Sequence, residues 1–155
     1  MNFKDNAVIL LATGCYVGKM PVAPGTAGSL LGILGCLVLS KIHLSLAVPA
    51  AVIFVVLAIW IAAAAEKILD KTDPGCIVID EIAGMIIALL GLPFNWSTVA
   101  IGFIFFRILD ILKPFPIGRL ERSFRGGVGV VIDDVAAGFI ANIALRCVLI
   151  IKDTI

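Results

Sequence analysis

The chain has 155 residues, of which 61% are hydrophobic and 15% are charged, and its formal net charge is +1. Soluble domains are typically about 45–50% apolar and about 25% charged, so the composition excludes an ordinary soluble domain. The near-zero net charge excludes a strongly basic, nucleic-acid-binding surface, and we expect no nucleic-acid partner. A mean hydropathy of +1.16 indicates that lipid covers the chain, and we expect a single integral-membrane domain over residues 1–155.

The N-terminal segment is apolar and carries one lysine, Lys4. Signal peptides share this pattern, but no convincing A-x-A cleavage site follows, so we expect the segment to belong to the mature protein. We interpret residues 6–18 as an interfacial or re-entrant helix.

Five further apolar runs predict an all-α, polytopic transmembrane helical bundle with four to five spanning helices. The clearest run is residues 48–65, which contain 18 residues without a charge. At about 1.5 Å per residue this length is enough to cross a bilayer core. Polar or Pro/Gly-rich segments separate the runs. The expected spans are residues 28–40, 48–65, 81–93, 97–112 and 131–151.

The basic residues predict the orientation of these helices. If the chain crosses once per run, loops 19–27, 66–79 and 113–129 lie on one side of the membrane and carry most of the lysines and arginines. Because cytoplasmic loops are enriched in these residues, we place this side in the cytoplasm of a multi-pass protein. Its basic residues are Lys19, Lys67, Lys71, Lys113, Arg119, Arg122 and Arg125, against Lys41, Lys152 and the nearby Arg146 on the other side.

Carboxylates are concentrated at the cytoplasmic ends of the expected helices. Charged groups within membrane spans are costly and persist when they are paired, hydrated or bound to metal. Only Arg107 and Lys113 lie beside them, so pairing leaves an acidic excess that one or two divalent cations would neutralise. Oxygen ligands without histidine or thiolate suit Mg²⁺. The five candidate metal ligands are Asp80, Glu81, Asp110, Asp133 and Asp134.

Each acidic cluster has an alternative, purely structural interpretation. Asp80 and Glu81 could be a helix-start pair stabilised by the helix dipole. Arg107 and Asp110 are spaced i, i+3 and could form an intrahelical ion pair. In the functional interpretation Asp110 binds metal, while Arg107 or Lys113 holds phosphate oxygens.

Two glycine-containing segments could place backbone N–H groups near an anion. Gly126, Gly127 and Gly129 precede Asp133–Asp134, and they could bring N–H groups close to an anion or simply form a flexible loop. Thr26 and Ser29 lie near the start of residues 28–40, where either hydroxyl could cap a helix or hold phosphate.

The remaining polar residues indicate little chemistry. Arg119, Arg122 and Arg125 are expected to contact anionic headgroups. His43 is the only histidine and lies on the far side in this topology, which argues against a histidine-nucleophile phosphatase. The four cysteines form no C-x-x-C pair, so we expect neither a disulfide framework nor a zinc site.

Four ordered motifs resemble the phosphatidylglycerophosphatase A family. They are PGTAGSL at 24–30, DEIAGM at 80–85, FRILDILKPFPI at 106–117 and GGVGVVIDDVAAG at 126–138. The resemblance implies Mg²⁺-dependent hydrolysis of phosphatidylglycerophosphate to phosphatidylglycerol at the cytoplasmic face of a bacterial inner membrane. Carried over by motif, the site residues are Thr26, Asp80, Glu81, Arg107, Asp110, Lys113, Asp133 and Asp134.

The expected chemistry is metal-assisted phosphomonoester hydrolysis. We expect Asp80, Glu81, Asp133 and Asp134 to be catalytic, and Thr26, Ser29, Arg107 and Lys113 to bind the substrate phosphate. A carboxylate could orient or deprotonate water, or Asp133 or Asp134 could form an aspartyl-phosphate.

Two other classes of membrane protein could also carry acidic residues in apolar helices. A membrane phosphotransferase would carry a DG…AR…G…D…D signature, which is absent from the sequence. A small transporter or channel subunit could use intramembrane acids for cation or proton passage, but no acid marks a path to the far side. The sequence leaves the oligomeric state open.

Overall fold

The computed structural model describes the backbone of residues 2–154 and the side chains of these residues other than 121, 122, 153 and 154. The regular elements of the described residues are all helices, with no strand among them, which confirms the expected all-α class. Arg122, expected at the lipid headgroups, lies outside the described side chains. The elements are α1 (Phe3–Ala12), η1 (Val17–Lys19), α2 (Pro24–Leu39), α3 (Leu44–Leu69), α4 (Ile79–Leu89), α5 (Trp96–Leu112), α6 (Ile117–Ser123) and α7 (Gly127–Thr154).

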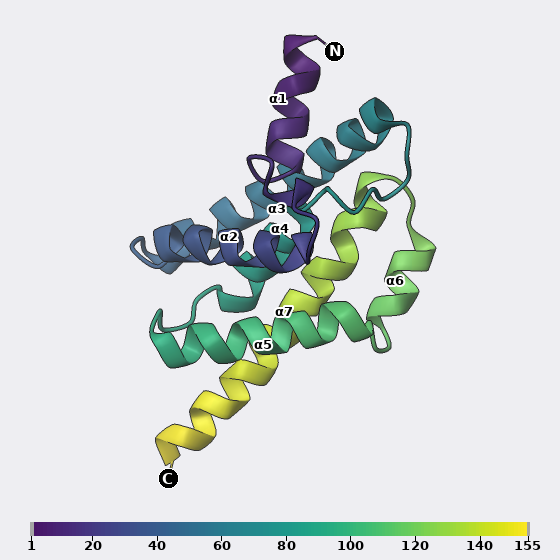
Figure 1. The fold of residues 1–155 in the computed structure, drawn as a ribbon. Helices are drawn as coiled ribbons and strands as arrows, with labels where there is room; N and C mark the ends of the chain where they lie inside the picture. Colours follow the sequence, from purple (N-terminus) through teal and green to yellow (C-terminus); the bar gives the residue numbers. More distant parts are fainter. Residues whose placement is uncertain (1, 155) are drawn as a thin grey trace.

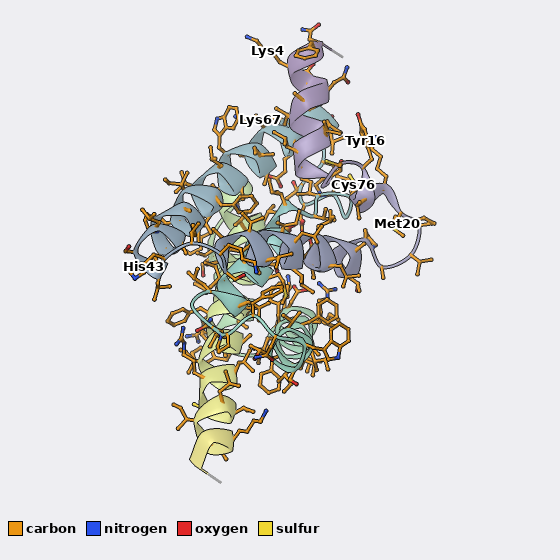
Figure 2. All side chains as sticks on the ribbon, turned by 90° about the vertical axis from the view of Figure 1, so that its left-hand side faces the viewer. Lys4, Tyr16, Met20, His43, Lys67 and Cys76 are labelled. Carbon is orange, nitrogen blue, oxygen red and sulfur yellow. The ribbon has the colours of Figure 1, made fainter. Side chains whose placement is uncertain are left out.

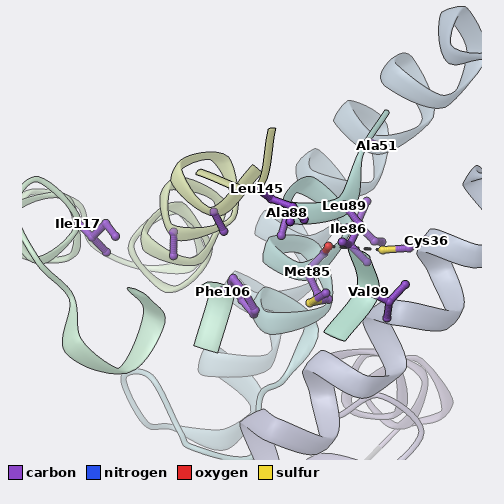
Figure 3. Packing of buried hydrophobic residues seen from close by; sticks show 12 residues of the cluster. Cys36, Ala51, Met85, Ile86, Ala88, Leu89, Val99, Phe106, Ile117 and Leu145 are labelled. Carbon is purple, nitrogen blue, oxygen red and sulfur yellow. Dashed lines mark hydrogen bonds between the residues drawn. The ribbon is translucent and has the colours of Figure 1, made fainter. Parts of the chain in front are cut away.

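The short helix α4 lies at the centre of the structure, packed by α2, α3, α5 and α7. Figure 1 shows the α2–α3 and α4–α5 connections at the left of the molecule, with the α3–α4 and α5–α6 connections at the right. Figure 3 shows Met85, Ile86 and Leu89 of α4 among side chains from neighbouring helices. From α2 to α6 the chain therefore runs back and forth between two ends of the molecule.

The number of membrane-crossing helices is smaller than the sequence predicted. Among the described residues, α3 and α7 are the two helices that are long and apolar enough to cross a membrane. Helices α2, α4 and α5 have 16, 11 and 17 residues, which correspond to about 24, 17 and 26 Å. A bilayer core is about 30 Å thick, so the prediction of four to five spans was wrong. The apolar runs at 28–40, 81–93 and 97–112 form shorter helices.

One face of α3 exposes apolar side chains at helical spacing. Val52, Val56 and Trp60 are 55%, 61% and 65% exposed, and residues four apart lie on the same face of a helix. The opposite face is lined by small buried residues, including Ala58 and Ala62. An extended apolar face of this kind marks a surface covered by lipid or protein.

The expected N-terminal helix at 6–18 is shorter and begins earlier. Helix α1 ends at Ala12, because Thr13 turns the chain: its hydroxyl donates to the Ile9 carbonyl at 2.7 Å and accepts from the Tyr16 N–H at 3.1 Å. Gly14 follows with a φ of +54°, a conformation that glycine adopts without steric cost. Figure 1 shows α1 crosswise to α2. Its interfacial or re-entrant placement stays a prediction.

Helix α4 ends inside the protein, where its last carbonyls need partners. Helix ends leave up to four carbonyls without intrahelical hydrogen bonds. The Asn142 side-chain amide on α7 donates to the carbonyls of Ile87, Ala88 and Leu90 at 3.0–3.1 Å. Arg146 donates to the Asn142 side-chain oxygen at 2.8 Å and to the Leu90 carbonyl at 3.1 Å. These two side chains allow α4 to stop after 11 residues within an apolar environment.

Helices α4 and α7 approach closely where glycines face each other. A side chain at Gly138 would overlap the Gly84 carbonyl oxygen, and a Cβ at Gly84 would lie 2.7 Å from the Asp134 carbonyl oxygen. Small residues at such a crossing let two helix backbones pack tightly. The crossing lies one helical turn after Asp80 on α4 and Asp134 on α7, so it brings the beginnings of both acidic motifs together.

Candidate active site

Three carboxylates meet where α4 and α7 approach. Asp80 and Glu81 come from the first turn of α4, and Asp134 from the second turn of α7. One oxygen from each lies within 4.8 Å of the other two, a spacing that could hold a metal ion. Asp80 is 8% exposed and Asp134 is 4% exposed. The structure therefore joins two of the acidic motifs found in the sequence.

Part of each carboxylate lacks a hydrogen-bond partner. Asp80 Oδ1, Glu81 Oε2 and Asp134 Oδ2 are buried, and none of them has a partner among the described residues. Burial raises the pKa of Asp80 well above its ordinary range, and the negative charge of Glu81 raises it further. Burial also raises the pKa of Glu81. Buried charges require pairing or a metal, so these oxygens fit a hard cation.

Arg107 connects α5 to the start of α2. Its Nη1 donates to Asp110 Oδ2 at 2.6 Å and to Ser29 Oγ at 3.3 Å. The expected i, i+3 ion pair is therefore present, and it lies beside the acidic cluster because Asp110 carries a negative charge close to Asp134 and Glu81. Arg107 Nε is buried without a partner among the described side chains. This N–H remains available to an oxyanion.

The first turn of α2 packs directly against Glu81. A side chain at Gly25 would overlap Glu81 Oε1, so the glycine permits this approach. Thr26 follows and is half-buried. Neither hydroxyl caps the helix, because Ala23 is the N-cap residue. Ser29 Oγ instead donates to the Gly25 carbonyl at 2.9 Å, so its hydroxyl is held between α2 and Arg107.

Lys113 and Asp133 form a second polar pair beside the cluster. Lys113 ends α5 in the left-handed conformation, with a φ of +43°, and its Nζ donates to Asp133 Oδ2 at 2.7 Å. Asp133 Oδ1 is buried without a partner among the described residues. The structure does not bring Asp133 into the group of three close carboxylates, and its role as a metal ligand stays a prediction.

Other residues singled out in the sequence lie away from these groups. His43 lies at the start of α3, where its side chain accepts from the Ser45 N–H at 3.3 Å, and Figure 2 shows it on the opposite side from Met20 and Cys76. All four cysteines are free, as expected. Gly25 was missed as a site residue, although it stands in the PGT sequence beside Thr26.

Comparison with known proteins identifies the relatives of this chain. The sequence model of the phosphatidylglycerophosphatase A family matches residues 10–149. The chain is similar to phosphatidylglycerophosphatase A of Escherichia coli K12, with 39% identity over 85% of this chain and 77% of the relative. It is also similar to phosphatidylglycerophosphatase A of Haemophilus influenzae, with 36% identity over 90% and 87%.

A third relative carries a different name. A protein of Bacteroides thetaiotaomicron named "Putative phosphatidylinositol-3-phosphatase" is 39% identical over 84% of this chain and 86% of its own length. No solved structure matches the chain. The relatives' names thus share phosphate-ester hydrolysis on a glycerophospholipid, with two different headgroups.

Proposed function

This chain belongs to the phosphatidylglycerophosphatase A family, and from this premise we propose that it hydrolyses phosphatidylglycerophosphate. The reaction cleaves the terminal phosphate monoester with water and gives phosphatidylglycerol and inorganic phosphate. The enzyme is thus a phosphoric monoester hydrolase of phospholipid metabolism. The comparisons give no support to the transporter or channel alternative.

The observation that carries the proposal is the buried group Asp80, Glu81 and Asp134 with its three unpartnered oxygens. An apolar protein gains nothing in stability from burying three acids beside one another. A bound cation would satisfy these oxygens, and an all-oxygen donor set favours Mg²⁺. When bound there, Mg²⁺ would neutralise phosphate charge and lower the pKa of a coordinated water.

Side chains around the three carboxylates would bind the substrate phosphate and stabilise the transition state. Arg107 offers a guanidinium whose Nε has no partner in the described structure, and planar N–H groups match phosphate oxygens well. Lys113 supplies a further positive charge beside Asp133. Together they would stabilise charge on the equatorial oxygens of an in-line transition state. Ser29 and Asp110 position Arg107, and Thr26 follows Gly25, the residue of α2 that packs against Glu81.

One carboxylate must act either as the general base for water or as the nucleophile that attacks phosphorus. In direct hydrolysis, a carboxylate orients or deprotonates the attacking water. In the covalent route, Asp133 or Asp134 would attack phosphorus, the P–O bond to the glycerol would break and release phosphatidylglycerol with a proton on its new hydroxyl, and water would then hydrolyse the acyl phosphate to inorganic phosphate. Both routes remain open, as does a second metal ion bound by Asp110 and Asp133.

The protein is proposed to act in a bacterial inner membrane, in contact with bilayer lipid and with the site at the cytoplasmic face. The length of α3 and α7 supports two crossings. The basic residues Lys67, Lys71 and Arg125 lie in or near the connections at the site end, which the positive-inside rule places in the cytoplasm. Acyl chains would stay among the apolar helix faces while the headgroup reaches the carboxylates.

Phosphate release from detergent-solubilised protein tests this proposal. The wild type is expected to release phosphate from phosphatidylglycerophosphate with Mg²⁺ and not with excess chelator, and Asp80→Asn is expected to be inactive while folded. Phosphatidylinositol 3-phosphate serves as the second substrate because of the Bacteroides relative. Preference for phosphatidylinositol 3-phosphate would contradict the assignment of substrate. Phosphate release that is unchanged by the chelator would contradict the assignment of a metal.

A further inference from the structure

A charged cleft opens beside the candidate active site. It has a volume of about 680 Å³, within the roughly 300–1,000 Å³ typical of small-ligand sites. One wall is the C-terminal end of α3 with the segment that follows it, and the other is the segment leading into α7. Its charged lining residues are the bases Lys67, Lys71 and Arg125 and the acids Glu66, Asp70, Asp73 and Asp133.

Two residues that line the cleft lie close to the acidic cluster. Asp133 lines the cleft and is the chain neighbour of Asp134, one of the three clustered carboxylates. Asp73 also lines the cleft, and it lies close enough to Asp80 for its negative charge to raise the pKa of Asp80. A ligand in the cleft would therefore lie next to a phosphate bound at the carboxylates.

Three basic side chains of the cleft are available to an anionic group of a ligand. Lys67, Lys71 and Arg125 line it, and none of them forms an ion pair with a described side chain. Two of the acids in the cleft already have partners: Glu66 Oε1 accepts the Asp73 N–H at 2.8 Å, and Asp133 pairs with Lys113. Figure 2 shows Lys67 near the end of α3 that borders the cleft.

The start of α7 adds polar groups that point to an oxygen-rich ligand. The first intrahelical hydrogen bond runs from the Val130 N–H to the Gly126 carbonyl at 3.2 Å, so the N–H groups of the first turn have no helical partner. Such N–H groups favour anions. Asp133 is 5% exposed and its Oδ1 has no partner among the described residues, so this oxygen can accept from a hydroxyl.

These features match the part of the substrate that lies between its phosphate monoester and its acyl chains. Phosphatidylglycerophosphate carries, next to the scissile phosphate, a glycerol with one free hydroxyl and then a phosphodiester. Resting on the function proposed above, we propose that the cleft binds this glycerol and phosphodiester. Lys71 and Arg125 contact the phosphodiester, and Asp133 Oδ1 accepts from the glycerol hydroxyl. The cleft thereby selects this headgroup over a lipid whose phosphate monoester is attached directly to diacylglycerol.

The test compares the Lys71→Ala/Arg125→Ala double variant with wild type on two lipids in neutral detergent micelles. Phosphatidic acid has a phosphate monoester but no phosphodiester. The variant should show a KM for phosphatidylglycerophosphate raised about tenfold or more, as expected for losing charge-assisted hydrogen bonds, with kcat within about twofold. The KM of the variant for phosphatidic acid should be unchanged. If phosphatidic acid is not hydrolysed, its inhibition constant should be unchanged instead.

Lys19→Ala provides the matched control, because Lys19 is exposed and its ammonium lies over the Tyr16 ring at 4.6 Å, outside the cleft. An equal rise in the kinetic constants for both lipids would overturn the proposal in favour of general electrostatic attraction. An equally large effect of Lys19→Ala would do the same. An unchanged KM for phosphatidylglycerophosphate in the double variant would also overturn the proposal. A wild type inactive on phosphatidylglycerophosphate would instead overturn the proposed function on which the cleft assignment rests.

Discussion

Two polar groups lie between the same two helices, α4 and α7, and they differ in how completely they are satisfied. At the end of α4, Asn142 and Arg146 donate to the terminal carbonyls, and Arg146 also donates to the Asn142 side-chain oxygen. At the start of α4, Asp80, Glu81 and Asp134 each keep a buried oxygen without a partner among the described residues. The first group completes the fold, and the second needs something that the chain does not supply. For these two groups of charged and amide side chains, the satisfaction of hydrogen bonds distinguishes the structural group from the candidate active site.

The largest expected loss of kcat is at Asp134, and it should exceed the loss at the neighbouring Asp133 of α7. Asp134→Asn should lower kcat by about 10²–10³-fold, the size associated with losing one preorganised charge-stabilising group, because Asp134 belongs to the close group of carboxylates. Asp133→Asn should cost about tenfold, because Asp133 pairs with Lys113 outside that group. Phosphate release by both variants measures the ratio. Equal losses would make Asp133 a member of the same centre.

A smaller loss is expected from Arg107→Lys. A lysine cannot keep the Nη1 contacts to Asp110 and Ser29 and also offer the N–H of Nε, and losing a charge-assisted hydrogen bond corresponds to about 10–100-fold in kcat/KM. Arg146→Lys is the matched change in the satisfied group and should leave kcat/KM within about twofold. Comparable losses from both substitutions would show that Arg107 acts through the fold alone.

In contrast to the variants of the candidate active site, Asn142→Leu should lower the stability of the protein and leave its activity nearly unchanged. The substitution leaves the Ala88 carbonyl without its donor, while the Ile87 and Leu90 carbonyls keep the Leu90 N–H and Arg146 respectively. An unsatisfied buried group costs about 1–3 kcal/mol. Denaturation in detergent measures the free energy of unfolding, and phosphate release by the folded fraction should change little. Unaltered stability with lost activity would place Asn142 in the functional group.

The smallest effect is expected at His43. Its side chain accepts from the Ser45 N–H at the start of α3, and removing an N-cap acceptor costs about 0.5–2 kcal/mol. His43→Ala should therefore lower the midpoint of thermal unfolding slightly and leave phosphate release unchanged. A substantial loss of activity would mean that the far end of the molecule contributes to the chemistry.

The sequence predicted the polar end of the molecule better than its membrane architecture. Asp80, Glu81 and Asp134 were found because charge is costly in apolar helices, and that signal does not depend on tertiary structure. The number of spans was overestimated, because hydropathy does not distinguish a membrane-crossing helix from a short helix such as α4 that is buried by its neighbours. Helix length is decided by caps, and those on α4 come from Asn142 and Arg146, more than 50 residues away in the chain.

The pairing within the site also depended on tertiary contacts. Lys113 was expected to bind the substrate phosphate, and its contact with Asp133 could not be predicted, because it joins the end of α5 to a residue 20 positions later on α7. Gly25 gave no chemical signal of its own; its importance follows from the approach of α2 to Glu81. The cleft residues Lys67 and Lys71 were interpreted only as orienting charges, since nothing in the sequence places them opposite Arg125.

Thermal unfolding of chelator-treated protein against increasing Mg²⁺, without substrate, tests the central claim that Asp80, Glu81 and Asp134 form a metal centre. Binding to the folded state raises its stability with ligand concentration, by about 2.7 kcal/mol at 100 times Kd. The account predicts a midpoint that rises with Mg²⁺ in wild type and in Asn142→Leu, the latter from a lower start, and no rise in Asp134→Asn. An equal rise in Asp134→Asn, or none in wild type, would contradict the assignment.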